Sequence, residues 1–226
     1  MRTPGSGTHA DQPLVRAGPP PGAARAGLIL LHGRGGHAAD ILALHRLLER
    51  DDVAALAPQA AGFSWYPDGF LAPWTVNAAG RDSGVSVIDG LVAALLAEGL
   101  PADRILIAGF SQGACLACDF LLRHPRRYGG LAALTGGLGG PPGSDWAAWL
   151  REDRPLSGMP AYLASGDPDP HVPWPRVAET AAVLEGLGAR VALHRLPGQG
   201  HQIGPASLDG LRALVRQVAE APPPAG

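Results

Sequence analysis

The chain has 226 residues, of which 46% are hydrophobic and 17% are charged, and its formal net charge is -2. This charge balance excludes the basic surface by which proteins bind nucleic acid or an anionic membrane. The two cysteines do not match the disulfide framework of a small secreted protein, and we expect neither a signal peptide nor a transmembrane segment. We therefore expect a single compact domain located in the cytoplasm, with no membrane span and no nucleic-acid partner.

Strand-like and helical patterns alternate along the chain. We predict an N-terminal segment over residues 1–26 with a weak edge strand and a proline-rich connector, one domain over 27–220, and a disordered tail over 221–226. Strands are expected at 13–16, 28–31, 53–57, 104–108, 131–135, 161–165 and 190–196, and helices at 38–50, 85–98, 114–122, 145–150, 176–187 and 206–218. This order predicts an α/β fold, a mostly parallel sheet with helices on both faces, and active residues at the carboxyl ends of its strands.

One motif, Gly109-Phe110-Ser111-Gln112-Gly113, lies between a predicted buried strand and a predicted helix. Gly-x-Ser-x-Gly in that setting is the nucleophile elbow of α/β-hydrolases, whereas the same letters elsewhere describe an ordinary turn. The two glycines are needed because side chains at their positions would collide with neighbouring backbone. The motif makes Ser111 the candidate nucleophile and predicts an α/β-hydrolase fold.

Two later loops offer partners for Ser111. The first contains Asp167 and Asp169, and the second ends in Gly200-His201. Serine, then acid, then histidine is the chain order of an α/β-hydrolase triad. His201 would take the proton of the Ser111 hydroxyl and later return it to the leaving group, while the acid holds the imidazole in the right tautomer.

An ordered set of short motifs spans nearly the whole predicted domain. The motifs are Leu31-His32-Gly33-Arg34-Gly35-Gly36, Trp65-Tyr66-Pro67, Phe70-Leu71-Ala72-Pro73, the elbow, Gly166 with Asp169 and Val172-Pro173, and Gly200-His201. Together they resemble the phospholipase/carboxylesterase family, which includes bacterial carboxylesterases and acyl-protein thioesterases. The resemblance implies Ser111 as nucleophile, Asp169 rather than Asp167 as acid, and His201 as base. It also implies an oxyanion hole formed by the backbone N–H groups of Arg34 and Gln112.

The aromatic loop over residues 63–74 is the candidate for substrate choice. Phe70, Leu71 and Trp74 are predicted to line an apolar acyl pocket, and Trp65 and Tyr66 to pack the loop onto the body of the domain. No insertion is long enough for a lid domain, which favours an open site for small or extended esters. The glycine-rich stretch 136–143 is interpreted as a flexible loop near the site.

Other motifs point to no cofactor and no metal. The loop that follows His32 lacks the Gly-Lys-Ser/Thr ending of a phosphate loop, so nucleotide binding is not expected and His32 is interpreted as structural. Cys115 and Cys118 lie three apart in one predicted helix with no second pair of ligands, and are interpreted as small packing residues.

These patterns predict a carboxylesterase-type serine hydrolase that cleaves esters or thioesters of short to medium acyl chains through an acyl-serine intermediate. Two alternatives stay open: a lactone or dienelactone-type hydrolase, and a non-catalytic protein of this fold that binds an acyl ligand. The expected partner is a small-molecule ester or thioester. Exposed apolar residues near the aromatic loop would also suit a homodimer.

Overall fold

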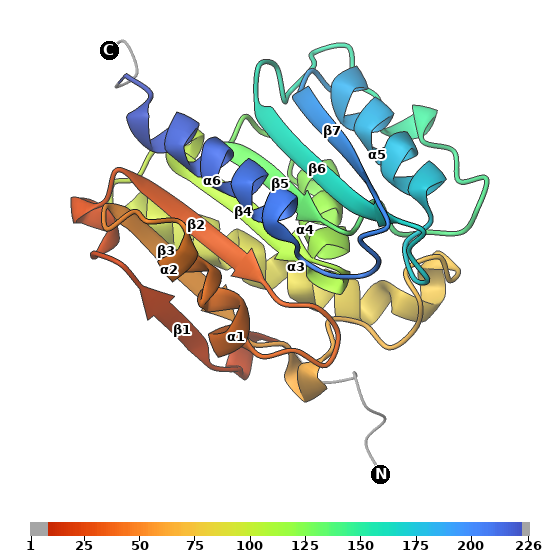
Figure 1. The fold of residues 1–226 in the computed structure, drawn as a ribbon, viewed down its shortest axis with the longest axis horizontal. Helices are drawn as coiled ribbons and strands as arrows, with labels where there is room; N and C mark the ends of the chain where they lie inside the picture. The colour runs from red at the N-terminus through yellow and green to blue at the C-terminus, as the bar shows by residue number, and fades with distance from the viewer. Residues whose placement is uncertain (1–8, 223–226) are drawn as a thin grey trace.

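A seven-stranded sheet forms the centre of the computed structural model, which describes residues 9–222 (Figure 1). The strand order is β1-β3-β2-β4-β5-β6-β7, with β1 antiparallel to β3 and all other neighbours parallel. The strands are β1 Leu14–Ala17, β2 Ala26–Leu31, β3 Val53–Pro58, β4 Ile105–Phe110, β5 Gly130–Leu134, β6 Pro160–Asp167 and β7 Arg190–Pro197. The start of the predicted N-terminal segment (1–8) and most of the predicted tail (223–226) lie outside the described residues.

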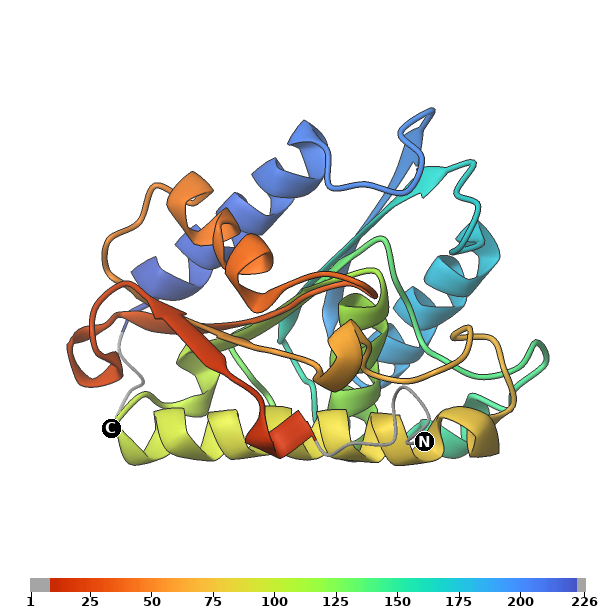
Figure 2. The ribbon, with the colours of Figure 1, turned by 90° about the horizontal axis from the view of Figure 1, so that it is seen from below.

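Helices cover both faces of the sheet (Figure 2). One face carries α1 Ala38–Leu42, α2 Leu44–Leu47 and α6 Pro205–Glu220, and the other carries α3 Trp74–Ala97, α4 Gln112–Arg123 and α5 Trp174–Gly186. On each face, the helices pack against the sheet and enclose a separate hydrophobic core. Because both faces are covered, the central strands are continuous apolar runs. The predicted mostly parallel sheet between two helical layers is confirmed.

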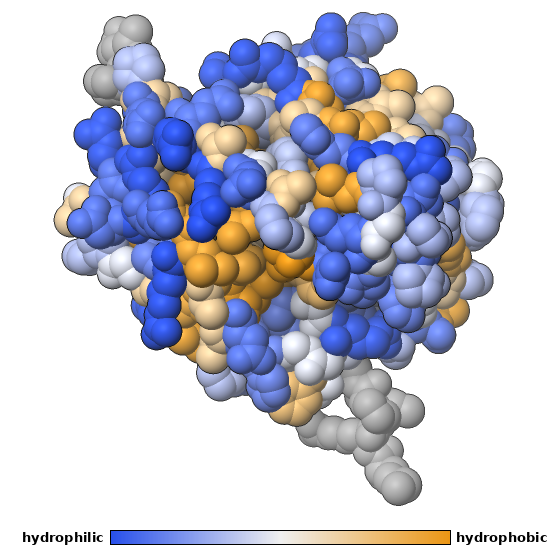
Figure 3. All heavy atoms as spheres, viewed as in Figure 1, coloured by the Kyte–Doolittle hydropathy of each residue, from blue (hydrophilic) through white to orange (hydrophobic). Residues whose placement is uncertain are grey.

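Two further observations concern the hydrophobic surface on one face of the molecule and the length of its helices. Figure 3 shows the face that carries α1 and α6, where hydrophobic surface is gathered in the hollow between these helices and polar surface surrounds it. Within residues 9–222, no helix combines the length and the hydrophobicity that crossing a bilayer requires.

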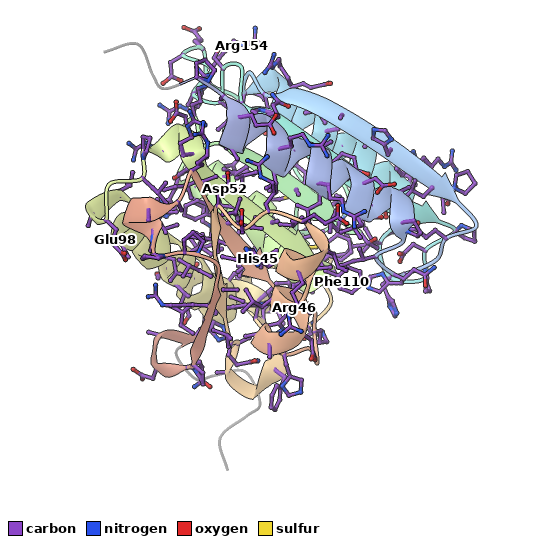
Figure 4. The ribbon with its side chains drawn as sticks, turned by 60° about the vertical axis from the view of Figure 1, so that its left-hand side comes forward. His45, Arg46, Asp52, Glu98, Phe110 and Arg154 are labelled. Carbon is purple, nitrogen blue, oxygen red and sulfur yellow. The ribbon has the colours of Figure 1, made fainter. Side chains whose placement is uncertain are left out.

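Two predicted helices are shorter in the structure. The helix expected over 38–50 is broken at Ala43 into α1 and α2. The buried ring of His45 on α2 donates to the Val53 carbonyl at 2.9 Å, which ties this turn to the start of β3 (Figure 4). The helix expected over 145–150 is only a 3-10 turn, Ala147–Trp149.

The helix expected at 85–98 begins much earlier, because α3 starts at Trp74 and therefore includes Gly80 and Gly84. Glycine weakens an isolated helix, so the sequence pattern is misleading at these positions. The structure gives the reason for the glycines. A Cβ at Gly80 would lie 2.5 Å from the Trp65 carbonyl oxygen, and one at Gly84 would lie 2.8 Å from a methyl carbon of Leu116. Close packing of α3 therefore overrides helix propensity.

Two alanine substitutions in α3 are expected to have opposite effects on stability. Gly80→Ala should lower the free energy of unfolding by about 2 kcal/mol, because its new methyl group meets rigid backbone. Gly90→Ala is the matched control, since nothing lies within 4 Å of a Cβ built there, and it should raise stability by about 1 kcal/mol through helix propensity. Denaturant unfolding of the two variants measures both changes. Equal effects would contradict the packing explanation.

Candidate active site

Ser111 occupies a strained turn between β4 and α4, with φ 53° and ψ -118°. The turn brings strand and helix so close that a Cβ at Gly109 would lie 2.4 Å from the Gly113 carbonyl carbon. A Cβ at Gly113 would lie 2.3 Å from the Leu31 carbonyl oxygen. The predicted need for glycine on both sides of Ser111 is confirmed, and the turn exposes the serine at the carboxyl end of β4.

Three side chains from three loops form one hydrogen-bonded series. The Ser111 Oγ lies 2.8 Å from His201 Nε2, and His201 Nδ1 lies 2.9 Å from Asp169 Oδ2. A carboxylate only accepts hydrogen bonds, so the proton of the neutral imidazole belongs on Nδ1 and the Nε2 lone pair faces the serine hydroxyl. Because β4, β6 and β7 are parallel, the loops after them meet at the same edge of the sheet.

Asp169, and not Asp167, is the acid that the structure brings to His201. Its side chain is fully buried, and Oδ1 also accepts two backbone N–H groups of the following loop, each at 2.8 Å. Asp167 ends β6 and instead accepts Arg195 Nε at 2.6 Å on the surface. Several donors thus hold the Asp169 carboxylate against the imidazole, while the Asp167 carboxylate is paired with Arg195.

The two predicted oxyanion-hole residues, Arg34 and Gln112, lie beside Ser111 in the wall of one cavity. Gln112 is the first residue of α4, where a backbone N–H has no acceptor within the helix. Within residues 9–222 the structure records no acceptor for the backbone N–H of either residue. The positive end of the α4 dipole also points to this place. These two N–H groups stay the predicted donors of the oxyanion hole.

This cavity has a volume of about 360 Å³. Of the predicted substrate-binding residues, Phe70 lines it, but Leu71 and Trp74 do not. Trp74 belongs to α3, where its ring lies 4.4 Å from the Arg81 guanidinium and packs edge-on against Trp146. The cavity is lined by Gly33, Arg34, Tyr66, Gly69, Phe70, Phe110, Ser111, Gln112, Cys115, His171, Val172 and His201.

Several lining residues were not singled out from the sequence as part of the pocket. Phe110 lies at the carboxyl end of β4 (Figure 4), with its ring centroid 5.2 Å from that of His201. The His171 ring packs edge-on against the same imidazole at 4.7 Å. Both residues are sequence neighbours of triad positions, and that proximity was the available signal. Tyr66 and Cys115 are buried, as packing predicts, but each also forms part of the cavity wall.

A sequence model of the phospholipase/carboxylesterase family matches residues 17–218. The chain belongs to the phospholipase/carboxylesterase family. Acyl-protein thioesterase 1 of Eremothecium gossypii is 28% identical, over 89% of this chain and 92% of that protein.

Solved structures agree with that assignment. The phospholipase/carboxylesterase from Dyadobacter fermentans is 38% identical with a TM-score of 0.84, and the match covers 91% of this chain and 96% of that one. Esterase PE8 is 29% identical with a TM-score of 0.75, over 92% and 98% of the two chains. The predicted α/β-hydrolase fold and the predicted class of enzyme, a carboxylesterase-type hydrolase, are confirmed.

In this member of the phospholipase/carboxylesterase family, the Gln112 side chain fastens the aromatic loop to the elbow. Its Oε1 accepts the Trp65 N–H at 2.8 Å, and its Nε2 donates to the Tyr66 carbonyl at 2.8 Å. Further along, Asn77 accepts the Asp68 N–H and donates to the Gly69 carbonyl, each at 2.9 Å. The loop that borders the cavity is therefore braced at two points, at Trp65-Tyr66 and at Asp68-Gly69, a role that sequence patterns do not reveal.

Two buried histidines support the same loop. His9 lies between the Trp65 carbonyl, 2.9 Å from Nε2, and the Ala61 N–H, 3.0 Å from Nδ1. His32 lies between its neighbour's carbonyl, 2.7 Å from Nδ1, and the Ala60 N–H, 3.0 Å from Nε2. His9 thus faces one acceptor and one donor, and His32 faces one acceptor and two donors, because Gln59 Nε2 also lies 3.0 Å from its Nε2. Only the neutral form of each ring satisfies these partners. The interpretation of His32 as structural agrees with these contacts.

Stability is expected to fall as the pH drops below about 6.5. Burial lowers the pKa of both His9 and His32, against the raising effect of their backbone carbonyl partners. The unfolded chain therefore binds protons first on acidification, so the native state loses up to about 1.4 kcal/mol per pH unit for each histidine. Unfolding measured from pH 8 to 5 checks the slope. His9→Asn should reduce the slope of stability against pH by the contribution of one histidine, up to about 1.4 kcal/mol per pH unit. An unchanged slope would contradict this account.

The glycine-rich stretch 136–143 is not the flexible loop that the sequence suggests. Residues 136–140 are buried. The Arg176 guanidinium, also buried, donates to the carbonyl oxygens of Leu138 and Gly140 at 2.8 and 2.9 Å. Glycine is needed there for close packing, since a Cβ at Gly136 would lie 2.4 Å from the Ala114 methyl group. Residues 136–140 are therefore packed in place, with Gly136 against the elbow helix, while 142–143 are exposed.

Proposed function

We propose that this chain cleaves carboxylic ester or thioester bonds of short to medium acyl chains through an acyl-Ser111 intermediate. The observation that carries the proposal is the hydrogen-bonded series from Ser111 Oγ through His201 to the buried Asp169 carboxylate. A serine hydroxyl is a weak nucleophile until a base removes its proton, and His201 Nε2 lies where that base must be. Asp169 fixes the tautomer and stabilises the imidazolium that forms.

The same groups account for each step of the reaction. Ser111 Oγ attacks the substrate carbonyl carbon as His201 Nε2 takes its proton, and the carbonyl oxygen becomes an oxyanion. The backbone N–H groups of Arg34 and Gln112 would donate to that oxygen, and losing one such donor typically costs about 3 kcal/mol of barrier stabilisation. As the oxyanion re-forms the carbonyl, the bond from its carbon to the leaving oxygen or sulfur breaks, and His201 gives its proton to that atom, which leaves as an alcohol or thiol. Water, activated by the same imidazole, releases the acid and restores Ser111.

Cavity size supports the proposed range of acyl chains. A volume of about 360 Å³ lies near the lower end of the range of about 300–1,000 Å³ for small-molecule sites. Its walls combine apolar surface from Phe70, Phe110 and Val172 with the polar groups of Ser111, His201, Arg34 and Gln112. A short acyl chain fills this space, whereas a long one would have to leave it for solvent.

Hydrolysis of 4-nitrophenyl esters from acetate to decanoate tests the proposed substrate class. We expect kcat/KM to rise to an optimum among the short to medium chains and to fall beyond it. A parallel series of acyl thioesters measures the preference for the leaving atom. Turnover of lactones with none of the linear esters would favour the lactone hydrolase, and no turnover of any ester, thioester or lactone would favour a non-catalytic acyl-binding protein.

A further inference from the structure

The charge of the catalytic cavity is one-sided. Among the described residues that line it, no aspartate or glutamate occurs, while Arg34 contributes a permanent positive charge. Burial raises the pKa of both Tyr66 and Cys115, so these two lining groups stay neutral. The carboxylate of Asp169 lies behind His201 and is already bonded to it. The wall that meets a substrate thus carries a cation and no anion.

The Arg34 guanidinium is held in place but not neutralised. Its Nη1 and Nη2 donate to the carbonyl oxygens of Pro67 and Asp68, both of which are uncharged acceptors. Within residues 9–222 the structure records no ion pair for Arg34, whereas the buried arginines near the site are paired, Arg81 with Asp119 and Arg176 with Glu179. Guanidinium has five N–H donors, so donors remain for a ligand.

The position of Arg34 indicates which part of a substrate it would meet. His201 must reach the leaving-group oxygen or sulfur, so the leaving group would lie against His201, whose ring is flanked by His171 and Phe110. The acyl group then extends toward the remaining walls, formed by Arg34 and the segment from Tyr66 to Phe70. Arg34 binds that same segment through its two carbonyl acceptors.

We propose that the Arg34 side chain binds a carboxylate at the far end of the acyl group, so that the preferred substrates are half-esters or half-thioesters of short dicarboxylic acids. This inference rests on the proposed function of the same site. Guanidinium binds carboxylates through paired, charge-assisted hydrogen bonds, and a fixed guanidinium loses little entropy when it does so. The overall charge of -2 does not attract anions, so the preference would come from this one side chain.

The test compares two substrates with the same leaving group, the 4-nitrophenyl half-ester of glutaric acid and 4-nitrophenyl hexanoate, after subtraction of uncatalysed hydrolysis. The wild type should have the higher kcat/KM for the glutarate. Arg34→Gln should lower the ratio of kcat/KM for the glutarate to kcat/KM for the hexanoate by about tenfold or more. Rising salt should lower the ratio in the wild type but not in the variant. Arg46→Gln is the control, because it removes the same charge from the exposed surface of α2 (Figure 4) and should leave the ratio unchanged.

The ratio separates the possible failures. Since the backbone of Arg34 is a proposed oxyanion donor, a general disturbance would slow both esters equally and leave the ratio at its wild-type value, which would overturn the assignment to Arg34. An equal drop in Arg46→Gln would also overturn it. A wild type that hydrolyses hexanoate without preferring glutarate would contradict this inference and leave the proposed function standing. A wild type that hydrolyses neither ester would contradict both.

Discussion

Replacement of Ser111 by alanine is expected to lower kcat for ester hydrolysis by about 10⁵- to 10⁶-fold. The variant keeps the cavity and the free N–H groups of Arg34 and Gln112 but has no atom that can form the acyl bond. The KM should change little, because Ser111 contributes one small polar group to binding. Steady-state hydrolysis of the best 4-nitrophenyl ester measures the effect.

The control for Ser111→Ala is the double variant with His201→Ala. Nucleophile and base act as one unit, so removing both should cost about as much as removing the serine alone. Ser111→Ala should unfold at nearly the wild-type temperature, since the left-handed turn already accommodates a side chain at position 111. Ser111→Ala retaining more than about one hundredth of the wild-type kcat would contradict the assignment of the nucleophile.

Asp169→Asn is expected to lower kcat by about 10⁴-fold, the loss seen when the acid of a serine hydrolase triad becomes an amide. The amide nitrogen would donate to His201 Nδ1 and thereby place the imidazole proton on Nε2, which then cannot accept the proton of Ser111.

The matched control for Asp169→Asn is Asp167→Asn, two residues away. It removes only a surface pair with Arg195 and should change stability by less than about 1 kcal/mol and activity by little. Measuring kcat for both variants at one pH shows which aspartate is the acid of the triad. A larger loss of kcat in Asp167→Asn would contradict the assignment of Asp169.

The sequence predicted the elements that depend on local patterns. Apolar runs such as Leu28–Leu31 became buried strands because a parallel sheet covered on both faces needs no alternation. The elbow was recognisable because its glycines are required by the turn itself. The alternation of strands and helices then places the loops of Ser111, Asp169 and His201 at one edge of the sheet, as observed.

Sequence reasoning failed where distant parts of the chain decide the outcome. The helix was expected to begin only at Val85, yet α3 begins at Trp74 and includes Gly80, which lies close to the Trp65 backbone. The stretch 136–143 looked flexible, yet Arg176, more than thirty residues later in the chain, binds its carbonyl oxygens. Trp74 looked like a pocket residue because it is aromatic and close to Phe70, but the first turn of α3 directs it to Arg81. Composition and periodicity carry no information about such contacts.

Trapping of the acyl-enzyme is the measurement that tests the central claim most directly. The protein is mixed rapidly with an excess of 4-nitrophenyl acetate, quenched in acid within the first turnovers, digested and examined by mass spectrometry. We expect a burst of nitrophenol and an acetyl group on the peptide that contains Ser111, both absent from Ser111→Ala. Rapid turnover with no label at Ser111, or with the label on another residue, would contradict the acyl-Ser111 mechanism.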